Sequence, residues 1–291
     1  MVDHLPAGIL LATDGSVGAA LPAAVELSSK TASELHIAHV RPTFPPYSHI
    51  ALTRDSELRE SQAREILFER LDEIEAAGGK AAGAHLLRGD TVREILALAG
   101  EMEAGLIVVG SRGLGPLRRL FFGSVSEGVA SRASCPVLIA RGAAWPPVRV
   151  VVGDDSSVGA KRAREFAADV ADLFDARLVL TRALPLFMDM AEAAQIPESG
   201  PTPPHVALGR HEMVLESHAR KLRDGLWERP EIRVGEGEAA SVILRAAGRN
   251  EGPTLVAVGR RGLGRVNRLR LGSVSTRVLR EAPGPVLICP S

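Results

Sequence analysis

Two short glycine- and serine-containing motifs that could together bind phosphate occur twice in the chain of 291 residues. The first copy reads Gly110-Ser111-Arg112-Gly113, then nine residues, then Gly123-Ser124-Val125-Ser126. The second copy reads Gly259-Arg260-Arg261-Gly262, then nine residues, then Gly272-Ser273-Val274-Ser275. Glycine lets a backbone approach a ligand closely, and the free amides at a helix start favour an anion. Because the serines open predicted helices, their hydroxyls add donors, and the pattern predicts a phosphate-binding turn.

An aspartate follows the first predicted strand of each half. Asp14 comes after the apolar run 8–13, and Asp155 comes after 148–153. In a parallel sheet with strands one and four adjacent, Asp14 and Gly110 face the same crevice. A carboxylate there could hold ribose hydroxyls or a magnesium ion bound to phosphates, which suits a nucleotide with two or three phosphates. Capping of the following helix is the alternative role for both aspartates.

The two copies belong to a repeat that covers most of the chain. Aligning 105–141 with 254–290 without a gap gives 19 identities in 37 positions. Together with the length, this repeat predicts two domains, at 1–141 and 148–291, joined by a linker at about 142–147.

Each half alternates apolar strand-like runs with helical patterns. In the first half we expect a strand at 8–13, a helix from Val17 to Lys30 capped by Ser16, and a helix at 56–77. Leu58, Ile66, Leu67, Leu71 and Ile74 give the last of these an apolar stripe. Strands that alternate with helices imply right-handed crossovers. The expected fold class is α/β, with a five-stranded, doubly wound parallel sheet in each half.

Composition and charge exclude several classes of protein. Thirty-five basic and 35 acidic residues give no net charge, which argues against a general nucleic-acid binder. The arginines at 260, 261, 265, 268 and 270 are interpreted as a solvated loop face. No signal peptide or membrane-length apolar run is evident, and Cys135 and Cys289 are the only cysteines, so we expect a cytoplasmic, reduced protein with no membrane partner.

Motifs of well-known enzymes are absent from the sequence. The chain has no G-x-G-x-x-G after its first strand, no lysine-bearing P-loop, no G-x-S-x-G and no H-E-x-x-H. His205, His211 and His218 lack the spacing of a helical metal pair, and His39 is expected to pack at the end of the second strand. No catalytic residue is therefore assigned.

These residues resemble the universal stress protein family. The resemblance rests on the G-x-x-G-x9-G-[ST] pattern, Asp-Gly-Ser after strand one and the closing Pro-Val-Leu-Ile strand, and it covers the whole chain as two tandem domains. It implies a Rossmann-like fold of the adenine nucleotide alpha hydrolase type. Members with the intact pattern generally bind ATP.

Carried over by position, the resemblance implies two ATP sites. Asp14 and Asp155 would lie beside ribose or a magnesium ion, and Val40 and Ala183 beside the adenines. Ribose and phosphate contacts would come from the two signatures: Gly110, Arg112, Gly113, Gly123, Ser124, Val125 and Ser126 in the first site, and Gly259, Arg261, Gly262, Gly272, Ser273, Val274 and Ser275 in the second. Ala183 is smaller than Val40, and Arg260 replaces Ser111, so the two affinities are expected to differ.

In the family, the closing strands of two domains pair edge to edge, which implies intramolecular pairing of the domains and a homodimer, and which could bring Cys135 near Cys289. A phosphate-binding turn without a general base predicts a regulatory ATP-binding protein in stress response, whose conformation or association a protein partner detects. The alternatives are a slow magnesium-dependent ATPase or a phosphoryl or nucleotidyl transfer enzyme, and a scaffold without ligand.

Overall fold

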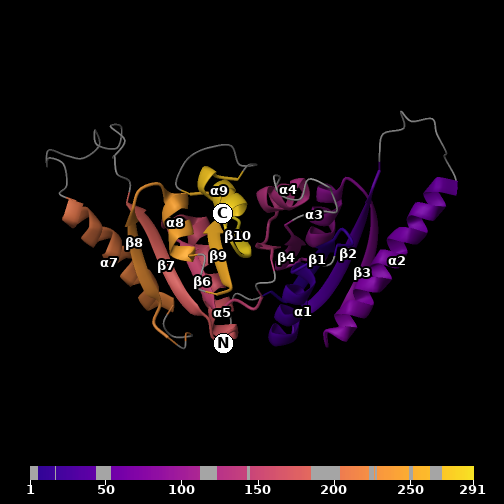
Figure 1. The fold of residues 1–291 in the computed structure, drawn as a ribbon, viewed down its shortest axis with the longest axis horizontal. Coiled ribbons are helices and arrows are strands. Elements are labelled where there is room, and N and C mark those ends of the chain that lie inside the picture. The colour runs from indigo at the N-terminus through magenta and orange to yellow at the C-terminus, as the bar shows by residue number, and fades with distance from the viewer. Residues whose placement is uncertain are drawn as a thin grey trace. The chain divides into compact units, whose positions relative to one another are not determined.

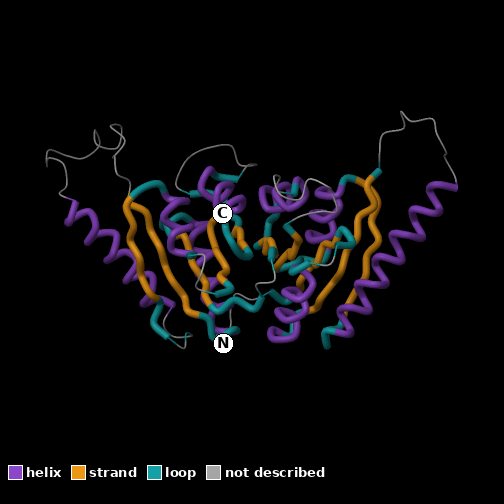
Figure 2. The backbone as a smooth tube through the Cα atoms, in the orientation of Figure 1, coloured by secondary structure: helices purple, strands orange, loops and turns teal. Residues whose placement is uncertain are grey.

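The computed structural model describes residues 6–16, 18–43, 54–111, 123–142, 145–184, 204–222, 226, 228–248, 252–262 and 271–291. The chain divides into two compact units between Trp145 and Pro146, and each is an α/β sandwich (Figure 1). Below, the first unit ends at Trp145 and the second begins at Pro146. Strands and helices alternate along both, as Figure 2 shows in orange and purple.

The first unit contains a five-stranded parallel sheet in the order β3-β2-β1-β4-β5. Right-handed crossovers in this order place α1 and α2 on one face and α3 and α4 on the other. In agreement, α1 contacts α2 and α3 contacts α4. The elements are β1 (Gly8–Thr13), α1 (Ala20–Thr31), β2 (Glu34–Pro42), α2 (Arg54–Ala76), β3 (Ala81–Gly89), α3 (Thr91–Glu101), β4 (Leu106–Gly110), α4 (Ser124–Arg132) and β5 (Val137–Ala140).

The second unit repeats this topology in the order β10-β9-β6-β7-β8, again with parallel pairing. Its central strands β6 and β9 are almost wholly buried, as expected for a sheet covered on both faces. The elements are β6 (Arg149–Gly153), α5 (Val158–Leu173), β7 (Arg177–Leu184), α7 (Pro204–Leu222), β8 (Glu231–Glu236), α8 (Ala239–Ala247), β9 (Thr254–Gly259), α9 (Ser273–Glu281) and β10 (Val286–Cys289).

The doubly wound α/β fold is therefore confirmed in both units, while the start of the first helix was predicted wrongly. The helix α1 begins at Ala20 instead of Val17, and its N-cap is Ala19, which makes no side-chain cap hydrogen bond. Ser16 was expected to cap the helix, but its amide and hydroxyl both donate to Asp14. An Asx turn after β1 thus takes the residues that a helix would have used.

The apolar stripe of α2 also differs in part from the prediction. Leu67 and Ile74 are buried as expected, but the other buried positions of this stripe are Ala63 and Arg70. Leu71 is only half-buried. A charged side chain therefore occupies a position of the helix that faces the interior.

Within the parts of the chain that the structure describes, no helix combines the length and apolarity needed to cross a membrane.

Candidate functional site

The carboxyl edge of the first unit brings the two predicted motifs together. Strands β1 and β4 are neighbours, with Ala12 paired to Val109, so Asp14 and Gly110 follow at the same edge of the sheet. Both residues line a cavity of about 190 Å³. This is the crevice at the change of strand order where doubly wound sheets place their ligands.

The same cavity collects the other predicted residues of the first site that the structure describes. Val40 lines it from the end of β2, and Gly123, Ser124, Val125 and Ser126 line it from the start of α4. Arg112 and Gly113 lie outside the described residues. The remaining wall is formed by side chains of β1, β2, β4 and four neighbouring segments: Leu11, Ala12, Thr13, Ser16, Gly18, Ala20, Leu21, Ala38, Arg70, Thr91, Ile95 and Val109.

The N-terminus of α4 is presented to this cavity without a side-chain cap. Its N-cap residue is Gly123, which has no side chain to cap the helix. In contrast, the Asp90 side chain caps α3 by accepting from Arg93 N at 2.9 Å. The Gly123 amide donates to Ser111 O at 3.3 Å, which ties the helix start to the end of β4. The uncapped amides of the first turn and the helix dipole together favour an anion at this place.

The two serines of this helix start have different roles. Ser124 is exposed and lines the cavity. Ser126 is 2% exposed, and its hydroxyl donates to Gly123 O at 3.0 Å. Both serines were expected to donate to a phosphate, but the hydroxyl of Ser126 stabilises the helix start instead. Ser124 thus presents an exposed hydroxyl to the cavity, whereas the Ser126 hydroxyl already has an acceptor within the helix start.

Asp14 lies on the opposite lip of the cavity. Its Oδ1 accepts from the Ser16 amide at 2.9 Å and from the Ser16 hydroxyl at 2.6 Å. The side chain is exposed, and it shapes the loop before α1. The carboxylate thus has a local structural role, although it does not cap α1, and it faces the space in which a ligand would lie.

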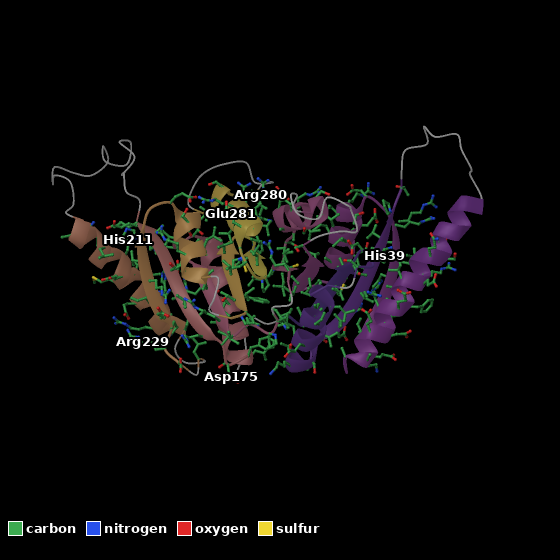
Figure 3. All side chains as sticks on the ribbon, viewed as in Figure 1. His39, Asp175, His211, Arg229, Arg280 and Glu281 are labelled. Atoms are coloured by element: carbon green, nitrogen blue, oxygen red, sulfur yellow. The ribbon has the colours of Figure 1, made fainter. Side chains whose placement is uncertain are left out.

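Val40 and His39 lie on successive positions of β2 and point to opposite faces, as alternate strand residues do. Val40 is 6% exposed and contributes an apolar wall to the cavity. His39, labelled in Figure 3, places Nδ1 2.9 Å from Thr13 O and is 9% exposed. His39 therefore joins β2 to the end of β1, which is the packing role expected of it.

The second unit assembles the matching residues at its own carboxyl edge. The Gly272 amide donates to Arg260 O at 2.9 Å, and α9 has no side-chain cap from the described residues. Ser273 is exposed, while the Ser275 hydroxyl donates to Arg260 O and Gly272 O. Val274 lies between them on α9. This helix start therefore repeats the arrangement of α4.

The other side of the second edge differs from its counterpart in how its helix begins. The helix α5 begins at Val158 and is capped by Ser157, whose hydroxyl also donates to Arg261 O at 3.2 Å. A Cβ on Gly259 would lie 2.7 Å from the carbonyl carbon of Gly159, so helix and glycine turn are in direct backbone contact. In the first unit the corresponding Gly18 precedes its helix and lines the cavity.

Asp155 and Ala183 complete the predicted second set. Asp155 Oδ1 accepts from the Ser157 amide at 2.9 Å, and Oδ2 contacts Gly262. Ala183 lies near the end of β7, two residues beyond Thr181, the strand partner of Gly153. It is half-buried.

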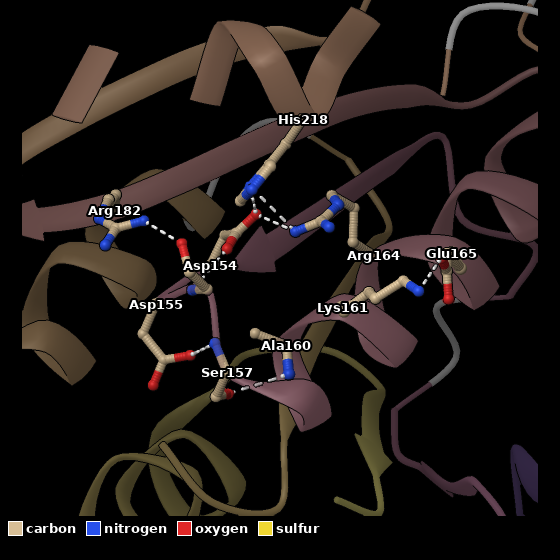
Figure 4. Close-up of polar contacts among 10 residues, drawn as sticks. Asp154, Asp155, Ser157, Ala160, Lys161, Arg164, Glu165, Arg182 and His218 are labelled. Carbon is tan, nitrogen blue, oxygen red and sulfur yellow. Dashed lines mark hydrogen bonds and ion pairs between the residues drawn. The ribbon is translucent and has the colours of Figure 1, made fainter. Parts of the chain in front are cut away.

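A buried charge cluster supports the end of β6 beside this edge (Figure 4). Asp154 Oδ2 lies 2.5 Å from Arg164 Nη1 and 2.7 Å from His218 Nδ1. Burial by itself would raise the pKa of Asp154, but Arg164, the Ser156 amide and His218 outweigh it and hold this pKa below the usual value. Sequence analysis missed this cluster, and had said of His218 only that it lacks the spacing of a helical metal pair.

Arg70 is the cavity residue that sequence analysis missed. It comes from α2, is 6% exposed, and lines the cavity together with Val40. Its position among Ala63, Leu67 and Ile74, at the spacing of the buried stripe, was a signal in the sequence.

No group of three or more His, Cys, Asp and Glu side chains that could hold a metal ion occurs among the described residues. The aspartates predicted to hold magnesium are Asp14 and Asp155. At either carboxyl edge, a magnesium ion would therefore need further ligands besides the aspartate, such as phosphate oxygens.

The fold and these two edges define a tandem, doubly wound α/β protein in which each unit has a helix start without a side-chain cap at its carboxyl edge. Comparison with known proteins then gives the family. The model of the universal stress protein family matches residues 8–141 and 148–290, and the chain belongs to this family.

Three relatives illustrate the similarity. A universal stress protein of Mycolicibacterium smegmatis is 30% identical over 97% of this chain and 96% of its own length. Universal stress protein YxiE of Bacillus subtilis is 37% identical over 46% of this chain and 97% of its own length. The crystal structure of a universal stress protein from Archaeoglobus fulgidus has a TM-score of 0.68, with 26% identity and 98% of each chain covered.

Proposed function

We propose that the protein binds ATP in the first-unit cavity and at the matching edge of the second unit, and acts as a regulatory protein. The observation that carries the proposal is the cavity itself. Asp14, Val40 and Gly110 line it together with the uncapped start of α4. An anion site at one end and an apolar wall at the other suit a nucleotide.

The polar groups suggest where the phosphates, ribose and adenine of ATP would lie in the cavity. Phosphates would accept from the first amides of α4 and from the exposed Ser124 hydroxyl. The Asp14 carboxylate would accept from ribose hydroxyls or hold a magnesium ion bound to the phosphates. The buried Val40 would contact the adenine.

The second site would bind more weakly. Its α9 start offers the same amides and the exposed Ser273. However, the backbones of Gly159 and Gly259 are in contact, which would leave less room for a ligand between them, and Ala183 offers a smaller apolar surface than Val40. We therefore expect two affinities rather than one.

Regulation rather than turnover is proposed because no general base or nucleophile is assigned at either edge. The bound nucleotide would stabilise one conformation or one association, which a protein partner would detect. The proposed assembly is a homodimer, with domains at 1–141 and 148–291 joined through 142–147.

Titration of the nucleotide-free protein with ATP tests the proposal. Calorimetry should give two binding events, with the weaker lost in Gly262→Glu, which places a carboxylate at the second turn. Mass spectrometry should identify adenine nucleotide released from purified protein. Absence of ATP binding in the wild-type protein would refute the proposal.

A turnover assay separates binding from catalysis. We expect steady-state ATP hydrolysis well below about one per second, with or without magnesium. A faster rate that is lost in Asp14→Ala and Asp155→Ala would instead support an ATPase.

A further inference from the structure

We propose that Arg70 is a specificity-determining residue of the first site, which donates hydrogen bonds to the nucleoside end of the bound nucleotide. The proposal rests on the proposed function, namely that a nucleotide occupies the first-unit cavity, and it adds a residue that lies outside both glycine motifs.

The first observation is that two donors of Arg70 lack partners. Its Nε and Nη1 are buried and form no hydrogen bond with any residue that the structure describes. A buried donor without an acceptor destabilises the protein, and more so when the group is charged. A buried guanidinium in this state therefore needs an acceptor that the described part of the chain does not supply.

The second observation is the direction of the guanidinium. Its Nη2 lies 3.2 Å from Glu69 Oε2 and 3.0 Å from Glu73 Oε1, and both carboxylates are solvent-accessible. One side of the group thus faces the surface, where its charge is balanced. The residue also lines the cavity, so the two remaining donors belong to its buried side.

The third observation concerns which part of a ligand Arg70 would meet. It belongs to α2, which packs on β2 and β3, whereas the α4 start follows β4. Strand β1 lies between β2 and β4, so the two ends of the cavity are about 10 Å apart across the sheet. Phosphates at α4 would therefore leave the base and ribose near Arg70.

The neighbouring wall fits the same assignment. Ala38, Val40 and Leu21 line the cavity, and all three are apolar. A nucleobase has flat apolar faces and ring nitrogens that accept hydrogen bonds at its edge. Arg70 would supply the donors for that edge or for the attached ribose oxygens, while the apolar side chains contact the faces.

A buried arginine of the second unit offers a contrast. Arg164, on α5, pairs with the buried carboxylate of Asp154. Arg70 pairs with the solvent-accessible carboxylates of Glu69 and Glu73 through Nη2. Its buried Nε and Nη1 are therefore left for a ligand, since no described residue accepts from them.

The test uses the full chain carrying Gly262→Glu, so that only the first site titrates, and compares ATP with inorganic tripolyphosphate. Arg70→Met should lower ATP affinity at least tenfold and leave tripolyphosphate affinity unchanged, because only ATP has a nucleoside. Arg64→Met is the matched control on the same helix, since Arg64 is exposed and pairs with Glu60. It should change neither affinity.

Thermal unfolding without ligand distinguishes a role of Arg70 in ligand binding from a role in stability alone. Replacing a buried unsatisfied guanidinium with an apolar side chain should leave the melting temperature equal or higher, while ATP binding falls. Arg70→Lys, which keeps the charge but loses the planar pair of donors, should also weaken ATP binding, and it serves as the second variant.

Three results would overturn the inference. Equal ATP affinity in wild type and both Arg70 variants would mean that Arg70 does not contact the ligand. Equal losses for ATP and tripolyphosphate would assign Arg70 to the phosphates. No ATP binding in the parent protein would refute the proposed function itself, and the inference with it.

Discussion

Asp155 and Gly262 are in contact across the carboxyl edge of the second unit. A Cβ on Gly262 would overlap Asp155 Oδ2. Glycine fits at position 262 because the Asp155 carboxylate occupies the space that a side chain would need. The contact joins the second residue after β6 to the turn after β9. Among the described residues other than its chain neighbours, the hypothetical Cβ meets only atoms of Asp155 within 4 Å.

Gly262→Ala should therefore displace the Asp155 carboxylate and weaken the second ATP site. We expect a loss of about tenfold in affinity, or about 1.4 kcal/mol, with the first site unchanged. Calorimetric titration of the full chain measures both sites.

The control for this change is Gly209→Ala on α7, where an added Cβ meets no atom of the described residues within 4 Å. It should leave both affinities unchanged and stabilise the protein by about 0.5–1 kcal/mol, because alanine favours helix. If Gly262→Ala left the ATP affinity of the second site unchanged, Asp155 would not be part of that site.

Ser124 and Ser126 give a second prediction, because the structure separates their roles. Ser124→Ala should weaken ATP binding about tenfold or more, since a hydrogen bond to a charged group contributes about 1.5–3 kcal/mol. Its stability should not change, because the side chain is exposed.

Ser126→Ala should lower the stability of the protein and leave its ATP affinity nearly unchanged. It removes a donor to Gly123 O, which still accepts from the Glu127 amide, so stability should fall by only about 1 kcal/mol, with little effect on affinity. Thermal unfolding and ATP titration of the two variants test the pair. If Ser126→Ala impaired binding more than Ser124→Ala, this division of roles would be wrong.

The sequence predicts the sheets well for a physical reason. Runs such as 8–13 are apolar throughout, as strands covered on both faces must be, and β1 occupies Gly8–Thr13 as expected. The start of α1 was missed because Asp14 and Ser16 hydrogen-bond each other, a local alternative to helix capping.

The contacts of Arg70 and of the Asp154 cluster could not be predicted from local patterns, although the spacing of Arg70 marks a buried position of α2. Arg70 has the spacing of a buried residue but the chemistry of an exposed one, and its burial depends on how α2 packs. Asp154 meets partners 10 and 64 residues away along the chain, Arg164 and His218. Such contacts depend on tertiary packing, which periodicity does not report.

Cys135 carries a third prediction, about reactivity. Burial raises the pKa of its thiol to about 11. At pH 8 only about one Cys135 thiol in a thousand is then thiolate, the form that reacts. Alkylation by iodoacetamide should be at least tenfold slower in the folded protein than in denaturant, and should accelerate with pH up to about 11.

Peptide mass mapping distinguishes Cys135 from Cys289 in that experiment. The unfolded protein is the control, because both thiols are then exposed. Rapid alkylation of Cys135 at pH 8 in the folded protein would contradict this prediction and would favour a redox role for this cysteine.

Asp154 gives the last prediction, a pH dependence of stability. Its pKa is lower in the folded protein than the ordinary value of 3.8, because Arg164, the Ser156 amide and His218 favour the carboxylate more than burial disfavours it. The folded state thus binds this proton less readily than the unfolded state. The stabilisation is therefore fully present above about pH 5 and is lost as the pH falls below 3.8 through the folded pKa.

Asp154→Asn removes the charge and leaves Arg164 buried without a carboxylate, so the free energy of unfolding should fall by about 3–5 kcal/mol at pH 7. The difference between wild type and variant should then shrink as the pH is lowered from 5 to 2. Urea unfolding at each pH measures it, and Asp175→Asn, at an exposed carboxylate, is the control. Asparagine is also tolerated at the positive φ of 51° found there, so this control should differ little from wild type at any pH. A constant difference between wild type and Asp154→Asn down to pH 2 would show that the Asp154 pKa is not lowered by folding.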